Sequence, residues 1–179
     1  MCYIDIIKQT EEGEYAESGI SDYMEKTIFI ACPISKYLTE TGMDKEFENF
    51  IKKVYSVCKE YTSKVFLALK REEYGKARMD DHVCTPLDYQ EMEKADLIIA
   101  IPEDSQGVAV ELGWASAMNK QVFLILSKNY NISPLITALH TVTNAEYCHI
   151  ENKYSKEVDV VLNAISGFLD SCMGETYNG

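Results

Sequence analysis

Residues 95–126 read ADLIIAIPEDSQGVAVELGWASAMNKQVFLIL, and this stretch decides the fold class. Its two apolar runs, residues 96–101 and 121–126, have the length and composition of buried parallel strands. The segment between them predicts a helix, whose small residues Gly113, Ala115 and Ala117 permit close packing on a sheet. A strand, a helix and a second strand in this order predict a right-handed crossover within a parallel sheet.

The same alternation continues on both sides of this stretch. Further strands are predicted at residues 27–32, 64–69 and 145–150. Further helices are predicted at residues 44–61, 133–139 and 156–173, and another at Thr85-Pro86, where threonine is an N-cap and proline the first helical residue. We therefore predict an α/β fold with a flavodoxin-like, doubly wound, five-stranded parallel sheet of order 2-1-3-4-5 and helices on both faces.

The domain organisation follows from the same pattern. We expect an acidic N-terminal extension at residues 1–26, one α/β domain at 27–173 and a short tail at 174–179. The chain has no run of about 18 apolar residues and no basic segment before an apolar one, so we expect a cytoplasmic protein that does not bind a membrane.

Charge and cysteine usage exclude several function classes. The 29 acidic and 17 basic residues give a net charge of -12, which opposes binding to nucleic acid. The six cysteines form no C-x-x-C pair and the three histidines lie apart, so neither a metal site nor a disulfide framework is expected. Neither G-x-G-x-x-G nor a P-loop is present, and we expect no cofactor.

A candidate site follows the third strand. In a doubly wound sheet, ligands bind beyond the carboxyl ends of the strands, where the loops ISKYLTETG and PEDSQG are polar. If the next helix starts near Gly107, its free N–H groups and the Ser105 hydroxyl can receive a phosphate. Glu111 then lies roughly 6 Å further along the axis, an offset similar to that between a 5'-phosphate and C1' of the same ribose. The helix dipole would favour an ionised, nucleophilic Glu111, although acids near helix starts are also common for dipole reasons alone.

Other charged residues are candidates for the same rim of the sheet. Asp88, early in the preceding helix, could supply a second carboxylate, or could simply be an acid at a helix start. The few cations available to an anionic substrate include Arg71 and Arg78 in the long polar segment 70–84, which could equally be a solvated loop.

These segments together resemble the nucleoside 2-deoxyribosyltransferase superfamily over about residues 27–168. The likeness is carried by IFIACPIS, KREEYG, LDYQEMEKADLIIAIPEDSQG, VAVELGWASAMNKQVFLIL and SPLITAL. It is closer to the branch that hydrolyses nucleoside 5'-monophosphates, which includes the cytidylate N-ribosidases and the 2'-deoxynucleoside 5'-phosphate N-hydrolases. The resemblance implies a nucleotide substrate, no metal or other cofactor, and a homodimer or higher homo-oligomer.

The resemblance also implies roles for particular residues. It implies that Glu111 is the nucleophile that forms a ribosyl intermediate and that Asp88 is its sugar-binding and catalytic partner. The implied substrate contacts are Ser105 and Gly107 to the 5'-phosphate, Arg71 and Tyr74 to base or phosphate, Ile34 and Ser35 in the first-strand loop, and Ser133 to the phosphate site of a neighbouring subunit.

Two departures from the family pattern bear on the substrate. The first-strand loop reads Cys32-Pro33-Ile34-Ser35 in place of the usual aromatic or Gly-rich segment, and Tyr37 is an alternative stacking residue. Ser105-Gln106 replaces the aspartate that transferases carry before the catalytic helix, which favours a phosphate-bearing substrate. The sequence thus predicts hydrolysis of a pyrimidine nucleoside 5'-monophosphate such as CMP, with a deoxyribosyltransferase or a non-catalytic nucleotide sensor as the alternatives.

Overall fold

The computed structural model describes residues 25–173. Almost all of the predicted N-terminal extension, residues 1–24, and the whole tail at 174–179 lie outside the described residues. No helix within 25–173 has the length and apolar character needed to cross a membrane.

Five parallel strands form the main sheet. They are β1 (Ile28–Ala31), β4 (Val65–Leu67), β5 (Leu97–Ala100), β6 (Gln121–Ser127) and β7 (Ala145–Ile150). Their spatial order is β4-β1-β5-β6-β7, which confirms the order 2-1-3-4-5 predicted for the strands of this sheet. In the centre, Ile28 of β1 pairs with Val65 of β4 and Leu97 of β5.

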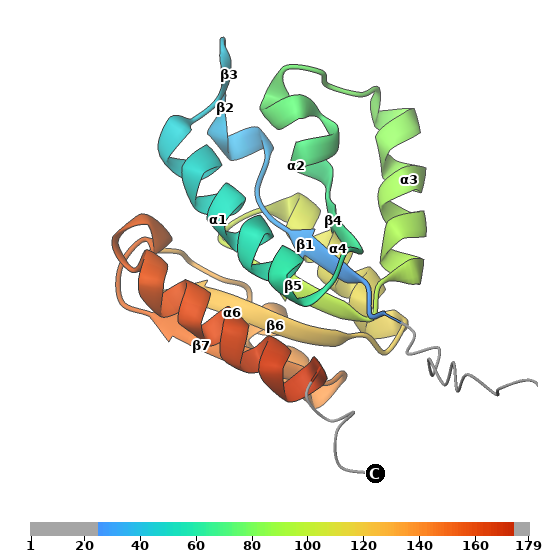
Figure 1. Cartoon of the computed structure of the whole chain (residues 1–179), viewed down its shortest axis with the longest axis vertical. Coiled ribbons are helices and arrows are strands. Elements are labelled where there is room, and N and C mark those ends of the chain that lie inside the picture. The colour runs from blue at the N-terminus through green and yellow to red at the C-terminus, as the bar shows by residue number, and fades with distance from the viewer. Residues whose placement is uncertain (1–24, 174–179) are drawn as a thin grey trace, which may run out of the picture.

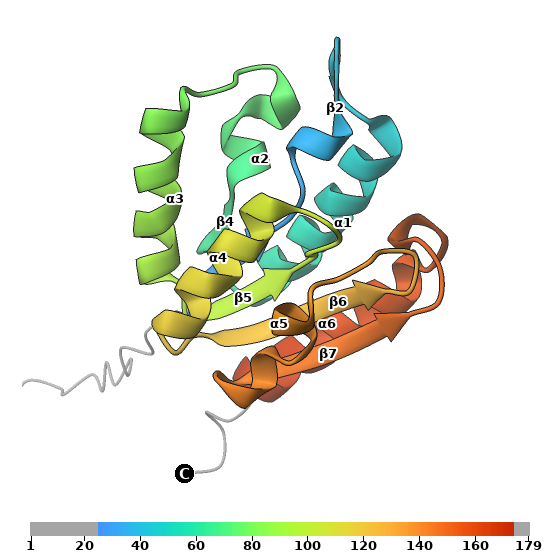
Figure 2. The same cartoon turned by 180° about the vertical axis from the view of Figure 1, so that it is seen from behind.

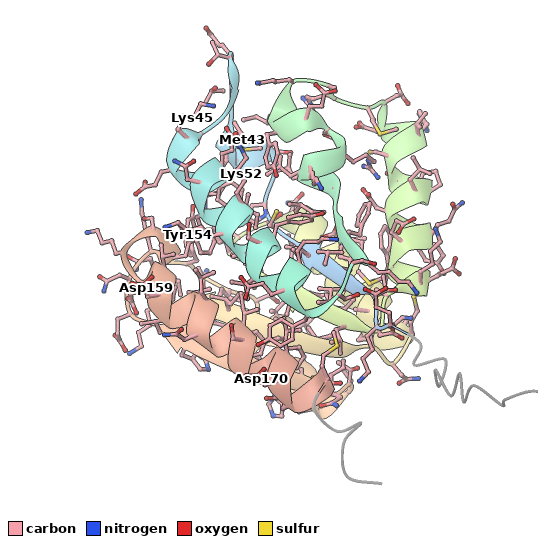
Figure 3. All side chains as sticks on the ribbon, viewed as in Figure 1. Met43, Lys45, Lys52, Tyr154, Asp159 and Asp170 are labelled. Carbon is pink, nitrogen blue, oxygen red and sulfur yellow. The ribbon has the colours of Figure 1, made fainter. Side chains whose placement is uncertain are left out.

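Helices cover both faces of this sheet, as predicted (Figures 1 and 2). One face carries α1 (Lys45–Tyr61) and α6 (Val158–Met173), and the other carries α3 (Asp81–Lys94), α4 (Gln106–Ala117) and α5 (Pro134–Thr137). Strand β1 alternates between the two cores, because Ile28 and Ile30 belong to the first and Phe29 and Ala31 to the second. On the first face, Tyr154 packs against Phe50 of α1 with ring centroids 4.3 Å apart (Figure 3).

Several short elements in the loops were not predicted. They are the 3-10 helices η1 (Ser35–Tyr37), η2 (Glu73–Gly75), η3 (Leu139–Thr141) and η4 (Tyr154–Lys156), the hairpin β2 (Leu38–Thr39) and β3 (Gly42–Met43), and helix α2 (Ala68–Arg71). The strand predicted at 64–69 ends at Leu67, because Ala68 already begins α2, where its carbonyl accepts from the Glu72 N–H.

Helix α3 begins at Asp81, before the predicted start at Thr85-Pro86. The side chain of Asp80 accepts a hydrogen bond from the His82 N–H at 2.9 Å and so caps the earlier start. Pro86 consequently lies inside the helix, where it cannot donate to the preceding turn. An aspartate N-cap is as strong a start signal as a threonine N-cap, and here Asp80 sets the first residue of α3.

The turn at Gly75 requires a conformation that glycine adopts readily, since its φ is +84° and an added Cβ would lie 2.7 Å from the Leu38 side chain. We expect Gly75→Ala to lower the free energy of unfolding by about 1–2 kcal/mol. The matched control is Gly167→Ala in α6, where an added Cβ meets no atom within 4 Å and alanine should stabilise by up to about 1 kcal/mol. Urea unfolding measures both, and equal effects would contradict the argument.

Candidate active site

A surface hollow of about 440 Å³ lies between the loops that follow β1 and β5. Its lining consists of Ser35, Lys36, Asp104, Ser105, Gln106 and Gly107. Strands β1 and β5 are neighbours, but the chain leaves them for helices on opposite faces, so the hollow lies at the switch point of the sheet. The structure thus brings Ser35, Ser105 and Gly107 together where the sequence places a ligand.

The N-terminus of α4 forms one wall of this hollow. Ser105 is the N-cap residue, and its hydroxyl accepts from the Val108 N–H at 3.4 Å. The helix starts at Gln106, one residue before the predicted position, and its first turn contains no acidic residue. The unpaired N–H groups of a helix start, together with the helix dipole, favour an anion at this place.

Glu111 follows the first helical residue, Gln106, by five positions and is partly buried. Burial, reinforced by the negative charge of Asp88, raises the pKa of Glu111 to about 8. The expectation that the helix dipole keeps this residue ionised is therefore wrong for the unliganded protein. The dipole acts mainly within the first turn, whereas desolvation acts directly on the carboxylate, so Glu111 is mostly protonated at pH 7.

Cys32, at the end of β1, lies in the electrostatic field of the same carboxylate. Its thiol is buried, and its pKa is raised by burial, then by the charges of Glu111 and Glu103. The end of β1 therefore lies near enough to Glu111 on α4 for the carboxylate charge to act on the thiol. A cysteine here has no sequence signal of its own, and the sequence analysis did not place it near Glu111.

Asp88 and Arg71 form an ion pair beside Glu111. The Arg71 Nη1 lies 2.7 Å from Asp88 Oδ1, which joins the end of α2 to α3. Burial raises the pKa of Asp88 despite the opposing effect of the Arg71 guanidinium. The Arg71 Nε is buried and has no hydrogen-bond partner among residues 25–173. Two predicted site residues are therefore brought together, and one retains an unused donor.

A second charged group at the hollow was missed by the sequence analysis. The Lys36 Nζ lies 3.0 Å from Glu103 and 2.7 Å from Asp104. The Tyr37 hydroxyl lies within 3.0 Å of both carboxylate oxygens of Glu103, while its ring stacks on Phe47 at 4.0 Å. One face of Tyr37 is thus already covered by a core ring. The polarity of the two loops was visible in the sequence, but the pairing between them was not.

The other predicted residues, Ile34, Tyr74 and Ser133, lie outside the lining of the hollow, as do Glu111, Asp88 and Arg71. Ile34 and Tyr74 pack against the α1 and α6 core, and the Lys52 Nζ lies 4.4 Å from the Tyr74 ring centroid. Ser133 is exposed and caps α5 in the loop after β6. Trp114 packs against the core on the α4 side of the sheet and edge-on against Tyr89, with ring centroids 5.3 Å apart.

Metal ligands do not cluster in the described part of the chain. No group of three or more His, Cys, Asp or Glu side chains within residues 25–173 is arranged to hold a metal ion.

Comparisons with known proteins show which family the chain belongs to and which solved structures share its fold. The fold is similar to that of the Clostridium botulinum CMP N-glycosidase BcmB, with 28% identity, a TM-score of 0.61, and coverage of 80% of this chain and 99% of that chain. It is also similar to BlsM, with 29% identity, a TM-score of 0.62, and coverage of 81% and 92%. None of the curated proteins compared with the sequence matches it significantly. The family model for nucleoside 2-deoxyribosyltransferase matches residues 28–163, and the chain therefore belongs to this family.

Proposed function

We propose that the protein is an N-glycosidase that hydrolyses a pyrimidine nucleoside 5'-monophosphate such as CMP to the free base and a (deoxy)ribose 5-phosphate. The observation that carries the proposal is the position of Glu111, one helical turn beyond an anion-binding helix start and beside the Asp88–Arg71 pair. The family acts on N-glycosidic bonds, and the similarity to a CMP N-glycosidase supports a nucleotide as substrate.

The reaction proceeds in two steps. Ionised Glu111 attacks C1', the bond from C1' to the base nitrogen breaks, and the base leaves with the bonding electron pair and takes up a proton from solvent. Water then attacks C1' of the glycosyl ester and gives up a proton to solvent, which releases the sugar phosphate and regenerates the Glu111 carboxylate. The nucleophile must be ionised, and the pKa of Glu111 in the unliganded protein is about 8. We therefore expect kcat/KM to rise with pH up to about that value.

The other residues bind and orient the substrate. The Ser105 hydroxyl and the amides near Gly107 receive the 5'-phosphate, and Ser35 and Lys36 face it across the hollow. Asp88 binds ribose hydroxyls or assists the departing base. Arg71 orients the Asp88 carboxylate through the ion pair at 2.7 Å.

A substrate panel tests the proposal. The purified protein is incubated with CMP, dCMP, UMP, dUMP, the purine nucleotides and the corresponding nucleosides, and free base and sugar phosphate are quantified by chromatography. Base release from a pyrimidine nucleotide but not from its nucleoside is the expected result. Tight nucleotide binding without base release would instead indicate a sensor.

Transfer of the sugar to a second base is the alternative activity, since the matching family model describes a transferase. Both reactions would use the same Glu111 intermediate and differ only in whether water or a base attacks C1'. Adding a free acceptor base to the assay distinguishes them, because only transfer forms a new nucleoside or nucleotide.

We also propose a homodimer in which Ser133 of one subunit approaches the phosphate site of the other. The support is the exposure of Ser133 and of three large apolar side chains, which are Val110 on α4, Leu135 on α5 and Val142 directly after η3. Sedimentation equilibrium at micromolar concentration tests this, and a monomer would remove the shared site.

A further inference from the structure

Lys36 forms ion pairs with two carboxylates that differ in exposure to solvent. The side chain of Glu103 is 2% exposed, and the Tyr37 hydroxyl bonds to it at 2.9 and 3.0 Å. The side chain of Asp104 is 60% exposed and bonds to Lys36 and to its own backbone. Glu103 is therefore buried and held by a second partner, whereas the Asp104 side chain lies at the surface, where water can replace its contact with Lys36.

The same arrangement opposes an anionic ligand. One ammonium and two carboxylates give the Lys36, Glu103 and Asp104 group one net negative charge. Lys36 is the basic residue in the lining of the hollow, and Asp104 lies in that lining too. A phosphate monoester carries nearly two negative charges at pH 7.5, so it would meet repulsion unless the charge distribution changes.

On the basis of the function proposed above, we propose that Asp104 competes with the substrate's 5'-phosphate for Lys36. When the substrate binds, its phosphate displaces the Asp104 carboxylate from the Lys36 ammonium. Release of Asp104 into solvent makes Lys36 available to the phosphate, while Glu103 and Tyr37 keep the lysine at the mouth of the hollow. Asp104 therefore lowers the affinity for every ligand that carries a 5'-phosphate and leaves the affinity for ligands without a phosphate unchanged.

The proposal is tested by ligand binding, which does not require turnover. Isothermal titration calorimetry measures the affinity of the full chain for ribose 5-phosphate and for cytidine. Asp104→Asn should tighten ribose 5-phosphate binding roughly three- to tenfold, as expected for one exposed charge removed near an anion, and should leave cytidine binding unchanged. The matched control is Asp159→Asn on α6, which changes the net charge equally and should have less than about a twofold effect (Figure 3).

A second pair of variants separates competition for Lys36 from simple repulsion. In a Lys36→Met background, Asp104→Asn should improve ribose 5-phosphate binding less than in the wild-type background, because no ammonium is left to release. Equal gains in both backgrounds would overturn the proposal. The proposal would also be overturned if Asp104→Asn bound ribose 5-phosphate no more tightly than the wild type, or if Asp159→Asn gained as much affinity. Failure of every variant to bind ribose 5-phosphate detectably would overturn it too. Tightened binding without any base release from nucleotides would support the competitor and contradict the proposed function.

Discussion

Replacing Glu111 with glutamine is expected to lower kcat/KM for base release by about a thousandfold or more, because the amide keeps the size of the side chain but cannot ionise and attack C1'. The measurement is chromatographic quantification of free base from the best substrate of the panel. Retention of more than about a tenth of the wild-type rate would remove Glu111 as the nucleophile, since loss of a covalent nucleophile costs far more.

The stability of the same variant shows whether the loss is chemical. The pKa of Glu111 rises from an ordinary 4.5 to about 8 on folding, so between these values the folded protein holds a proton that the unfolded chain releases. The free energy of unfolding therefore falls as pH rises from about 5 to 8 and loses nothing more from this group above 8. After a discount for residual exposure, Glu111→Gln should be more stable than wild type by about 2 kcal/mol at pH 9 and nearly equal at pH 5. Thermal unfolding at both pH values measures this difference.

Asp88→Asn is expected to lower kcat/KM by about a hundredfold, because the amide still accepts from Arg71 but no longer carries the charge that acts on the sugar or the departing base. It should also move the acidic limb of the pH profile to lower pH, because the charge of Asp88 is one cause of the raised pKa of Glu111. A residue with a purely structural role would lower the rate without moving the limb.

The control for Asp88 is Glu91→Gln on the same helix. Glu91 is paired with Lys94 at 2.6 Å, and its loss removes the same charge one turn further along α3. We expect a rate within about twofold of wild type and an unmoved pH profile. A hundredfold loss in Asp88→Asn with an unshifted limb would show that Asp88 does not act on Glu111 through its charge.

The main sheet was predictable because its signals are local. Each central strand is a short apolar run, and the alternation with helices fixes parallel pairing and the order of the strands. The boundaries that differ are those where two local signals compete. Asp80 and Thr85 are both good N-caps, and in the structure the Asp80 side chain caps the helix, which begins at Asp81.

The candidate site was predictable only where it is continuous in the sequence. Ser105, Gly107 and Glu111 lie on one loop and one helix, so their spacing alone gives their relative positions. The Lys36–Glu103 pair joins residues that are far apart in the chain. The backbone of Glu103 also has a left-handed φ of 43°, which residues other than glycine and asparagine rarely adopt. The pKa of Glu111 depends on burial and on Asp88, neither of which spacing reveals.

Strand β1 contributes alternate side chains to both cores, so neither core can open without the other. All four of its residues are almost completely shielded from water. Its amide hydrogens should therefore exchange with deuterium only through global unfolding, as expected for the last segment to lose protection. The loop that brings Ser35 and Lys36 to the hollow thus follows directly on a strand that water reaches only when the whole domain unfolds.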